Sequence, residues 1–134
     1  MCLKNPVEAR TGNKLYTRYK MVRIENDELV APYAGRAILE QHWQDIIPSR
    51  RITPDYSFDG MGYHVYVDIR AAQKILQNPF RYDRSWRIVK IQTRYRVATG
   101  DFANWKAEIW RTYKILKFVG TKDAKRLNKE FGYK

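Results

Sequence analysis

The stretch from Ser85 to Gly100 constrains the fold most, because its side chains change character at almost every residue. Apolar or β-prone side chains stand at every second position, and cationic or polar ones fill the positions between. The first set is Val89, Ile91, Thr93, Tyr95 and Val97, and the second is Lys90, Gln92, Arg94 and Arg96. Successive side chains of a β-strand point to opposite faces. The pattern therefore predicts one long strand with an apolar inner face and a basic outer face.

Other segments carry the periodicity of strands or of amphipathic helices. The expected strands are residues 15–24, 28–33, 63–69 and 105–119, the last of which could be helical in its first half. The expected helices are residues 37–47, residues 70–77 with Asp68 or the turn after it as a cap, and residues 122–131 with Ala124, Leu127 and Phe131 as an apolar stripe. Residues 1–14 are expected to form an irregular arm, residues 48–60 a loop, and residues 25–27 and 99–101 turns. This order predicts an α+β fold, a largely antiparallel sheet of about five strands with two to three helices packed on it.

The chain has 134 residues, which is the length of a single domain spanning residues 1–134. Hydrophobic residues make up 44% of it, which excludes wholesale disorder. The one cysteine, Cys2, excludes an intramolecular disulfide and favours a reducing, intracellular setting. No apolar run approaches the roughly 18 residues of a membrane span, and no secretory signal is visible, so no membrane partner is expected.

The net charge is +12, and it is unevenly distributed along the chain. Residues 1–83 hold 12 basic and 10 acidic side chains, whereas residues 84–134 hold 14 basic and 4 acidic ones. A basic excess confined to one part of a chain favours a polyanionic partner, either nucleic acid or an acidic protein surface. The alternative is a solvated surface that only keeps the protein soluble.

Basic and aromatic residues are interleaved in this second part of the chain, which is the composition that single-stranded nucleic acid needs. A basic sheet face could also follow the backbone of a duplex. The residues expected to contact the polyanion are Arg87, Lys90, Arg94, Arg96, Lys114, Lys125 and Arg126. The competing interpretation is that the aromatic side chains form the core and the cations only solvate its far side.

The evidence for catalysis is weaker. His64, Tyr66 and Asp68 alternate along one expected strand, so they would emerge about 7 Å apart on one face. They could form a polar catalytic face with His64 as acid or base, or a face that a helix covers. Cys2 would become an N-terminal nucleophile if Met1 were removed. With one Cys and two distant His, and with no nucleotide-binding or metalloprotease motif, neither a metal nor a cofactor is expected.

Several short motifs resemble a known group of proteins. These are Met1-Cys2-Leu3, Tyr19-Lys20, the strand Gly62-Tyr63-His64-Val65-Tyr66 followed by Ala71-Ala72, and residues 89–100. Together they are similar to small uncharacterised tailed-bacteriophage proteins that begin Met-Cys-Leu, some of which gut bacteria also encode. The resemblance implies a phage or prophage origin and action in the bacterial host cytoplasm or the virion, but no particular activity.

A looser similarity is to ADP-ribosyltransferase-like folds, in which a Gly-aromatic strand, an Ala-rich helix and a further strand recur in this order. That resemblance would make Glu108 the one carboxylate in a late strand able to serve in catalysis. Three hypotheses therefore stand: a non-enzymatic binding protein for a polyanion, an anti-defence or structural protein docking on a host or virion complex, and an enzyme. The charge distribution favours the first.

Overall fold

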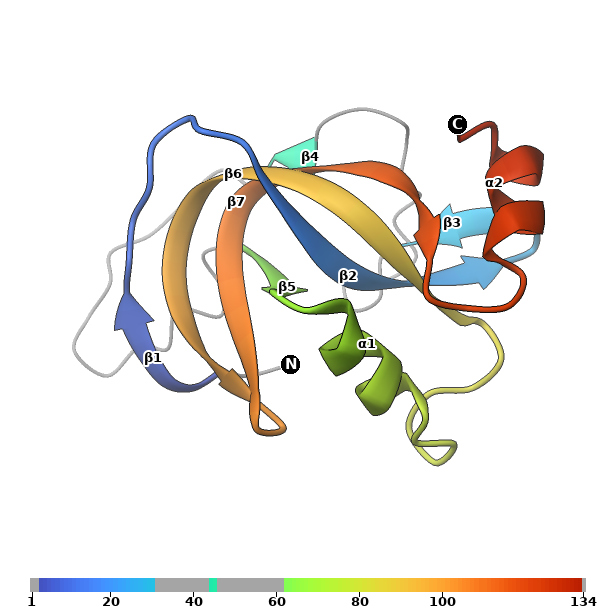
Figure 1. The fold of residues 1–134 in the computed structure, drawn as a ribbon, viewed down its shortest axis with the longest axis horizontal. Coiled ribbons are helices and arrows are strands. Elements are labelled where there is room, and N and C mark those ends of the chain that lie inside the picture. The colour runs from blue at the N-terminus through green and yellow to red at the C-terminus, as the bar shows by residue number, and fades with distance from the viewer. Residues whose placement is uncertain (1–2, 31–43, 46–61, 134) are drawn as a thin grey trace.

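The computed structural model describes residues 3–30, 44–45 and 62–133, and these form an antiparallel sheet with two helices (Figure 1). The strands are β1 Lys4–Glu8, β2 Tyr16–Glu25, β3 Glu28–Val30, β4 Gln44–Asp45, β5 Tyr63–Tyr66, β6 Trp86–Phe102 and β7 Trp105–Val119. The helices are α1 Ile69–Leu76 and α2 Ala124–Phe131. The α+β class is confirmed, but this part of the chain holds seven strands where about five were predicted, and two helices.

The long hairpin of β6 and β7 is the largest element of the fold. The two strands pair from Ile88 opposite Val119 to Phe102 opposite Trp105, with bulges after Lys90 and after Arg96. The prediction of one long strand over residues 85–100 is confirmed, and residues 105–119 are a strand throughout. The turn predicted at residues 99–101 is wrong. The strand continues to Phe102, and the chain reverses at Ala103 and Asn104, both with positive φ, as a two-residue hairpin turn requires.

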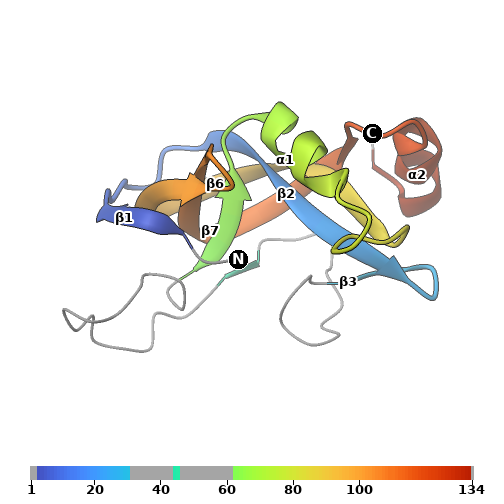
Figure 2. The same cartoon turned by 90° about the horizontal axis from the view of Figure 1, so that it is seen from below.

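The sheet closes on itself around this hairpin (Figures 1 and 2). The outer edge of β6 pairs with β2, and further along with β1. The outer edge of β7 pairs with β5 and β4, and β5 meets β2 where Tyr66 lies opposite Tyr19. A ring β2–β6–β7–β5 results. Residues 4–8 of the predicted irregular arm are thus a strand, held by backbone pairing although all their side chains are exposed.

Apolar side chains are buried on both faces of β6. Ile88 belongs to a cluster with Ala71, Ala72 and other residues under α1, whereas its neighbour Val89 packs with Leu127 of α2. Figure 2 shows α1 lying over one face of the sheet. The predicted basic outer face is therefore limited to the middle of β6, where Lys90, Gln92, Arg94 and Arg96 are partly exposed.

Local signals explain where the helices begin and end. The Asp68 carboxylate accepts a hydrogen bond from the backbone N–H of Arg70 at 2.9 Å, which confirms the predicted cap. The strand before it stops at Tyr66 instead of continuing to Ile69, because the chain turns to present this cap. At the other end of the protein, Leu127 is the buried residue of α2, and Gly132 ends that helix in the left-handed conformation.

Part of one predicted helix is wrong. Residues 37–47 were expected to be helical, but Gln44 and Asp45 form β4 beside Tyr113 and Thr112 of β7. The remaining residues of that prediction, the loop expected at 48–60 and residues 31–33 of the strand expected at 28–33 lie outside the described residues. The turn predicted at residues 25–27 is confirmed, since Asn26 and Asp27 both have positive φ between β2 and β3.

Replacing Asn128 should show what attaches α2 to the sheet. Its side chain both donates to the carbonyl of Phe118 at 3.0 Å and accepts from the N–H of that residue at 2.6 Å. Asn128→Ala leaves these two backbone groups beside a buried side chain without partners. We expect a loss of roughly 1–3 kcal/mol in the free energy of unfolding, measured by urea denaturation. The exposed neighbour serves as control, because Lys129→Ala should change stability by less than about 0.5 kcal/mol. Equal losses in the two variants would contradict this role.

Candidate functional site

Two of the predicted polyanion contacts, Arg87 and Arg126, form ion pairs with carboxylates of α2 and its cap residue Asp123. The Arg87 guanidinium lies 3.1 Å from the Asp123 carboxylate, and Arg126 reaches the same oxygen at 3.2 Å and Glu130 at 2.8 Å. Arg87 also donates to the carbonyl of Trp86 at 2.8 Å. Burial raises the pKa of Asp123, but hydrogen bonds from Thr121 and Arg87 outweigh it and hold that pKa below the usual value. The ion pair between Arg87 and Asp123 attaches α2 to the start of β6.

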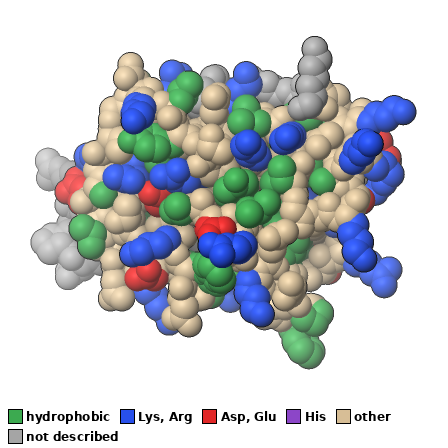
Figure 3. Space-filling model, in the orientation of Figure 1, with side chains coloured by type: hydrophobic (Ala, Val, Ile, Leu, Met, Phe, Trp, Pro, Cys, Tyr) green, Lys and Arg blue, Asp and Glu red, His purple; other side chains and the backbone are tan. Residues whose placement is uncertain are grey.

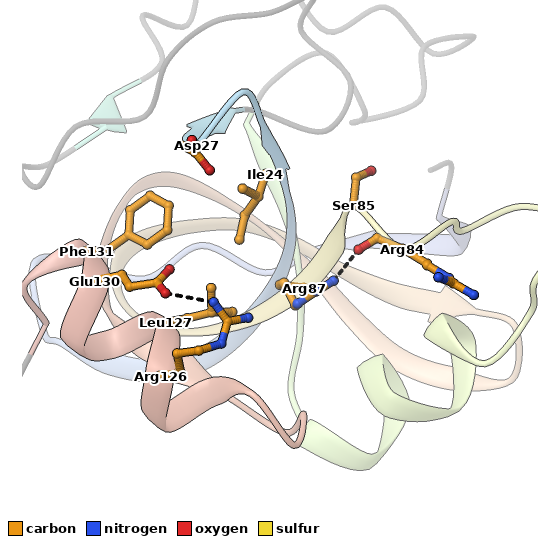
Figure 4. A pocket seen from close by; sticks show the side chains of 9 residues that line it. All are labelled: Ile24, Asp27, Arg84, Ser85, Arg87, Arg126, Leu127, Glu130 and Phe131. Carbon is orange, nitrogen blue, oxygen red and sulfur yellow. Dashed lines mark hydrogen bonds and ion pairs between the residues drawn. The ribbon is translucent and has the colours of Figure 1, made fainter.

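A hollow of about 540 Å³ lies between α2, the β2–β3 turn and the start of β6 (Figure 4). Its lining residues are Ile24, Asp27, Arg84, Ser85, Arg87, Arg126, Leu127, Glu130 and Phe131. Arg126 is paired with Glu130 there, and the side chain of Arg84 extends away from both. Because Asp27 and Glu130 bring acidic groups to the same walls, this hollow has no strong excess of positive charge.

Arg96, a third predicted contact, is joined to the buried Glu108. The Glu108 carboxylate is 4% exposed and accepts from Arg18 at 2.5 Å, from Arg96 at 2.9 Å and from the indole N–H of Trp110 at 3.0 Å. Arg96 also donates to the carbonyl of Ala9 at 2.8 Å. Both oxygens of Glu108 are therefore engaged, and the carboxylate serves to hold β2, β6 and β7 together. Its catalytic role stays a prediction from resemblance.

His64, Tyr66 and Asp68, which were predicted to share a catalytic face, do not all lie on one strand, because β5 ends at Tyr66. Tyr66 is 2% exposed within the cluster under α1, and Asp68 caps α1 and pairs with Arg70. Hydrogen bonds from Arg70 lower the pKa of Asp68. His64 is partly exposed and lies opposite Ile109 of β7. Cys2 lies outside the described residues.

Three lysines line up on the α1 face of the hairpin, and we call them the lysine strip: Lys90, Lys114 and Lys117. Lys90 lies directly opposite Lys117, and Lys114 lies opposite Gln92. Side chains two residues apart on a strand share a face. The strip therefore continues the face of Ile88 and Val119, which pack in the cluster under α1.

None of the three strip lysines takes part in an ion pair among the described residues. All three are partly exposed. Nearby, the Arg94 and Arg111 guanidiniums lie 5.7 and 5.9 Å from the ring centroid of Tyr95. The last predicted contact, Lys125, is exposed on α2. The strip thus contains two of the seven predicted residues, and adds Lys117.

Sequence reasoning missed a buried lysine. Lys20 of β2 is 6% exposed, and its amine donates to the carbonyl of His64 at 3.0 Å. The amine also lies 5.8 and 5.5 Å from the ring centroids of Tyr63 and Tyr113. No carboxylate pairs with it in the described part of the chain, and burial lowers its pKa from 10.5 to about 8. The one available signal was a lysine directly before the apolar pair Met21-Val22 in a strand.

The chain matches no protein-family model, no curated protein and no solved structure at a significant level. Neither described helix is long and apolar enough to cross a membrane. Within the described residues, no group of three or more His, Cys, Asp or Glu side chains could hold a metal ion.

Replacing Lys20 should stabilise the protein in a pH-dependent way. Its folded-state pKa lies below its unfolded value, so the cost of burying the ammonium is complete below pH 8 and disappears as pH rises toward 10.5. We expect Lys20→Met to raise the free energy of unfolding at pH 7 by roughly 1–3 kcal/mol. The difference from the wild type should shrink by pH 10, as measured by chemical denaturation at each pH. Lys114→Met on the lysine strip is the control and should show no such trend. A Lys20→Met effect that stays constant from pH 6 to 10 would contradict the burial cost.

Proposed function

We propose that this protein binds nucleic acid through the face of the sheet on which α1 packs. The proposal is based on the lysine strip. Lys90 and Lys117 are direct cross-strand neighbours, and such like-charged pairs are unfavourable in a sheet. No carboxylate of the described residues offsets their repulsion. A row of phosphates alongside the strip would do so, and would release counterions on binding.

The distribution of the other cations supports the same face. Arg87 and Arg96, two of the three arginines of β6 predicted to contact the polyanion, form ion pairs with Asp123 and Glu108. Exposed cations without such partners recur around α1, at Lys74 on its last turn and at Arg81 in the following loop. Figure 3 looks onto this face, where Lys and Arg side chains are spread over the surface and acidic ones are few.

The competing partner is an acidic protein surface, and it differs from nucleic acid in the anionic groups that it presents. Nucleic acid presents a regular row of phosphates, whereas an acidic protein presents carboxylates. Polyglutamate should therefore displace a bound oligonucleotide only at a large excess of charge. A phage or prophage origin, with action in the bacterial host cytoplasm or the virion, stays a prediction from resemblance.

Neutralising the lysine strip tests the proposed face. The triple variant Lys90→Gln, Lys114→Gln, Lys117→Gln should weaken binding of a fluorescent oligonucleotide, measured by anisotropy at several salt concentrations. The slope of log affinity against log salt should fall by about 2 to 3, because each phosphate contact contributes about 0.7 to 0.9.

A matched triple on α2 supplies the control: Lys125→Gln, Arg126→Gln, Lys129→Gln. It removes the same charge from three exposed positions of a helix that lies apart from α1 (Figures 1 and 2). It should change the slope by less than one. The proposal fails if wild-type protein does not bind at low salt, or if the α2 triple weakens binding as much as the strip triple.

A further inference from the structure

We propose that a hollow between the end of α1 and the tip of the β6–β7 hairpin takes one unpaired nucleobase. This would give the α1 face a preference for single-stranded nucleic acid. The inference rests on the proposed function and names the form of the ligand.

The hollow has a volume of about 240 Å³ and mainly apolar walls. Its lining residues are Lys74, Ile75, Asn78, Arg81, Tyr82, Phe102, Ala103 and Trp105. Of its aromatic residues, Phe102 and Trp105 are partly exposed and Tyr82 is buried, and the two cations, Lys74 and Arg81, are exposed. Aromatic surface beside phosphate-pairing cations is the combination with which proteins hold single strands, since every base has a face that can stack.

The tip of the hairpin is built with backbone strain. Ala103 has φ 49° and Asn104 has φ 68°. Asparagine tolerates the left-handed conformation, whereas alanine adopts it at a cost in free energy. Ala103 is therefore strained in this turn. It places Phe102 directly opposite Trp105, and both rings stay partly exposed where they border the hollow.

The loop after α1 presents a second aromatic group. Phe80 is 99% exposed, although the loop that carries it is well anchored. The backbone N–H of Phe80 donates to the Asn78 side chain at 3.1 Å, and the N–H of Tyr82 donates to the Asn78 carbonyl at 3.0 Å. The Tyr82 ring is buried against Trp86, with centroids 4.9 Å apart. A loop held in this way keeps Phe80 in solvent, directly before Arg81, which lines the hollow.

The hollow and the lysine strip belong to the same face. Phe102 and Trp105 pack against the cluster under α1, and so does Tyr19, which lies opposite Lys90. A strand whose phosphates follow the strip can therefore continue past α1 toward Arg81 and Lys74. An apolar segment of an acidic protein is the competing occupant, but the strip of lysines ahead of the hollow favours a chain with regularly spaced negative charges.

Three probes of equal length separate the contributions of bases and phosphates: oligothymidine, the same strand with abasic sites throughout, and a duplex. We expect wild-type protein to bind oligothymidine best. Trp105→Ala, which removes one wall of the hollow, should weaken oligothymidine binding by roughly 5- to 100-fold. It should leave the abasic strand and the duplex within about twofold. Arg81→Gln should weaken all three, because it removes a phosphate contact.

Val7→Ala is the matched control, since Val7 is 62% exposed on β1 and lies outside the hollow. It should change no affinity. Equal binding of oligothymidine and the abasic strand by the wild type would overturn the inference but leave the proposed function standing. So would equal loss on all three probes in Trp105→Ala. Failure of all three probes to bind wild-type protein at low salt would overturn both.

Discussion

The pairing of β6 with β7 is the constraint on which the rest of the structure depends. β6 and β7, with 17 and 15 residues, are the longest described strands, and the bulges after Lys90 and Arg96 bend the pair. Their outer edges are then brought round to β2 and β5, which meet and close the ring. The same pairing places Lys90 opposite Lys117, so the proposed binding face is a direct consequence of the register.

The basic residues divide into two groups with different roles. Arginines of the sheet form ion pairs with carboxylates, because the planar guanidinium can donate to a carboxylate and to nearby carbonyls at the same time. Arg87 and Arg96 do so with Asp123 and Glu108. The lysines of the strip have no such partners among the described residues and keep their charge toward solvent. Net charge alone does not reveal this division.

Periodicity was a good guide wherever it reflected burial. Residues 85–100 and 105–119 were predicted as strands, and the cap at Asp68 and the stripe of α2 were also found, because each rests on a local pattern of side chains. β1 was missed because its side chains are all exposed and only its backbone pairs. β4 was missed because the helical spacing of nearby apolar residues outweighed two residues of strand.

The site was harder to predict, since it depends on which strands become neighbours. Nothing local shows that Glu108 lies beside Arg18, which is 90 positions away in the chain. For the same reason, Lys117 could not be recognised as the partner of Lys90, nor Lys20 as a buried amine under Tyr63 and Tyr113. The Lys90–Lys117 pair follows from the register of the hairpin and the other contacts from ring closure, and the order of elements specifies neither.

We propose that nucleic acid contacts the α1 face and not the α2 side. Ultraviolet crosslinking of wild-type protein to a uniformly labelled single strand, followed by mass spectrometry of the attached peptides, distinguishes the two surfaces. We expect crosslinks at Phe80, Trp105 and Tyr19, which lie on or beside the α1 face. Crosslinks concentrated at Phe131 and Tyr133 on the α2 side would contradict it, as would the absence of any crosslink at low salt.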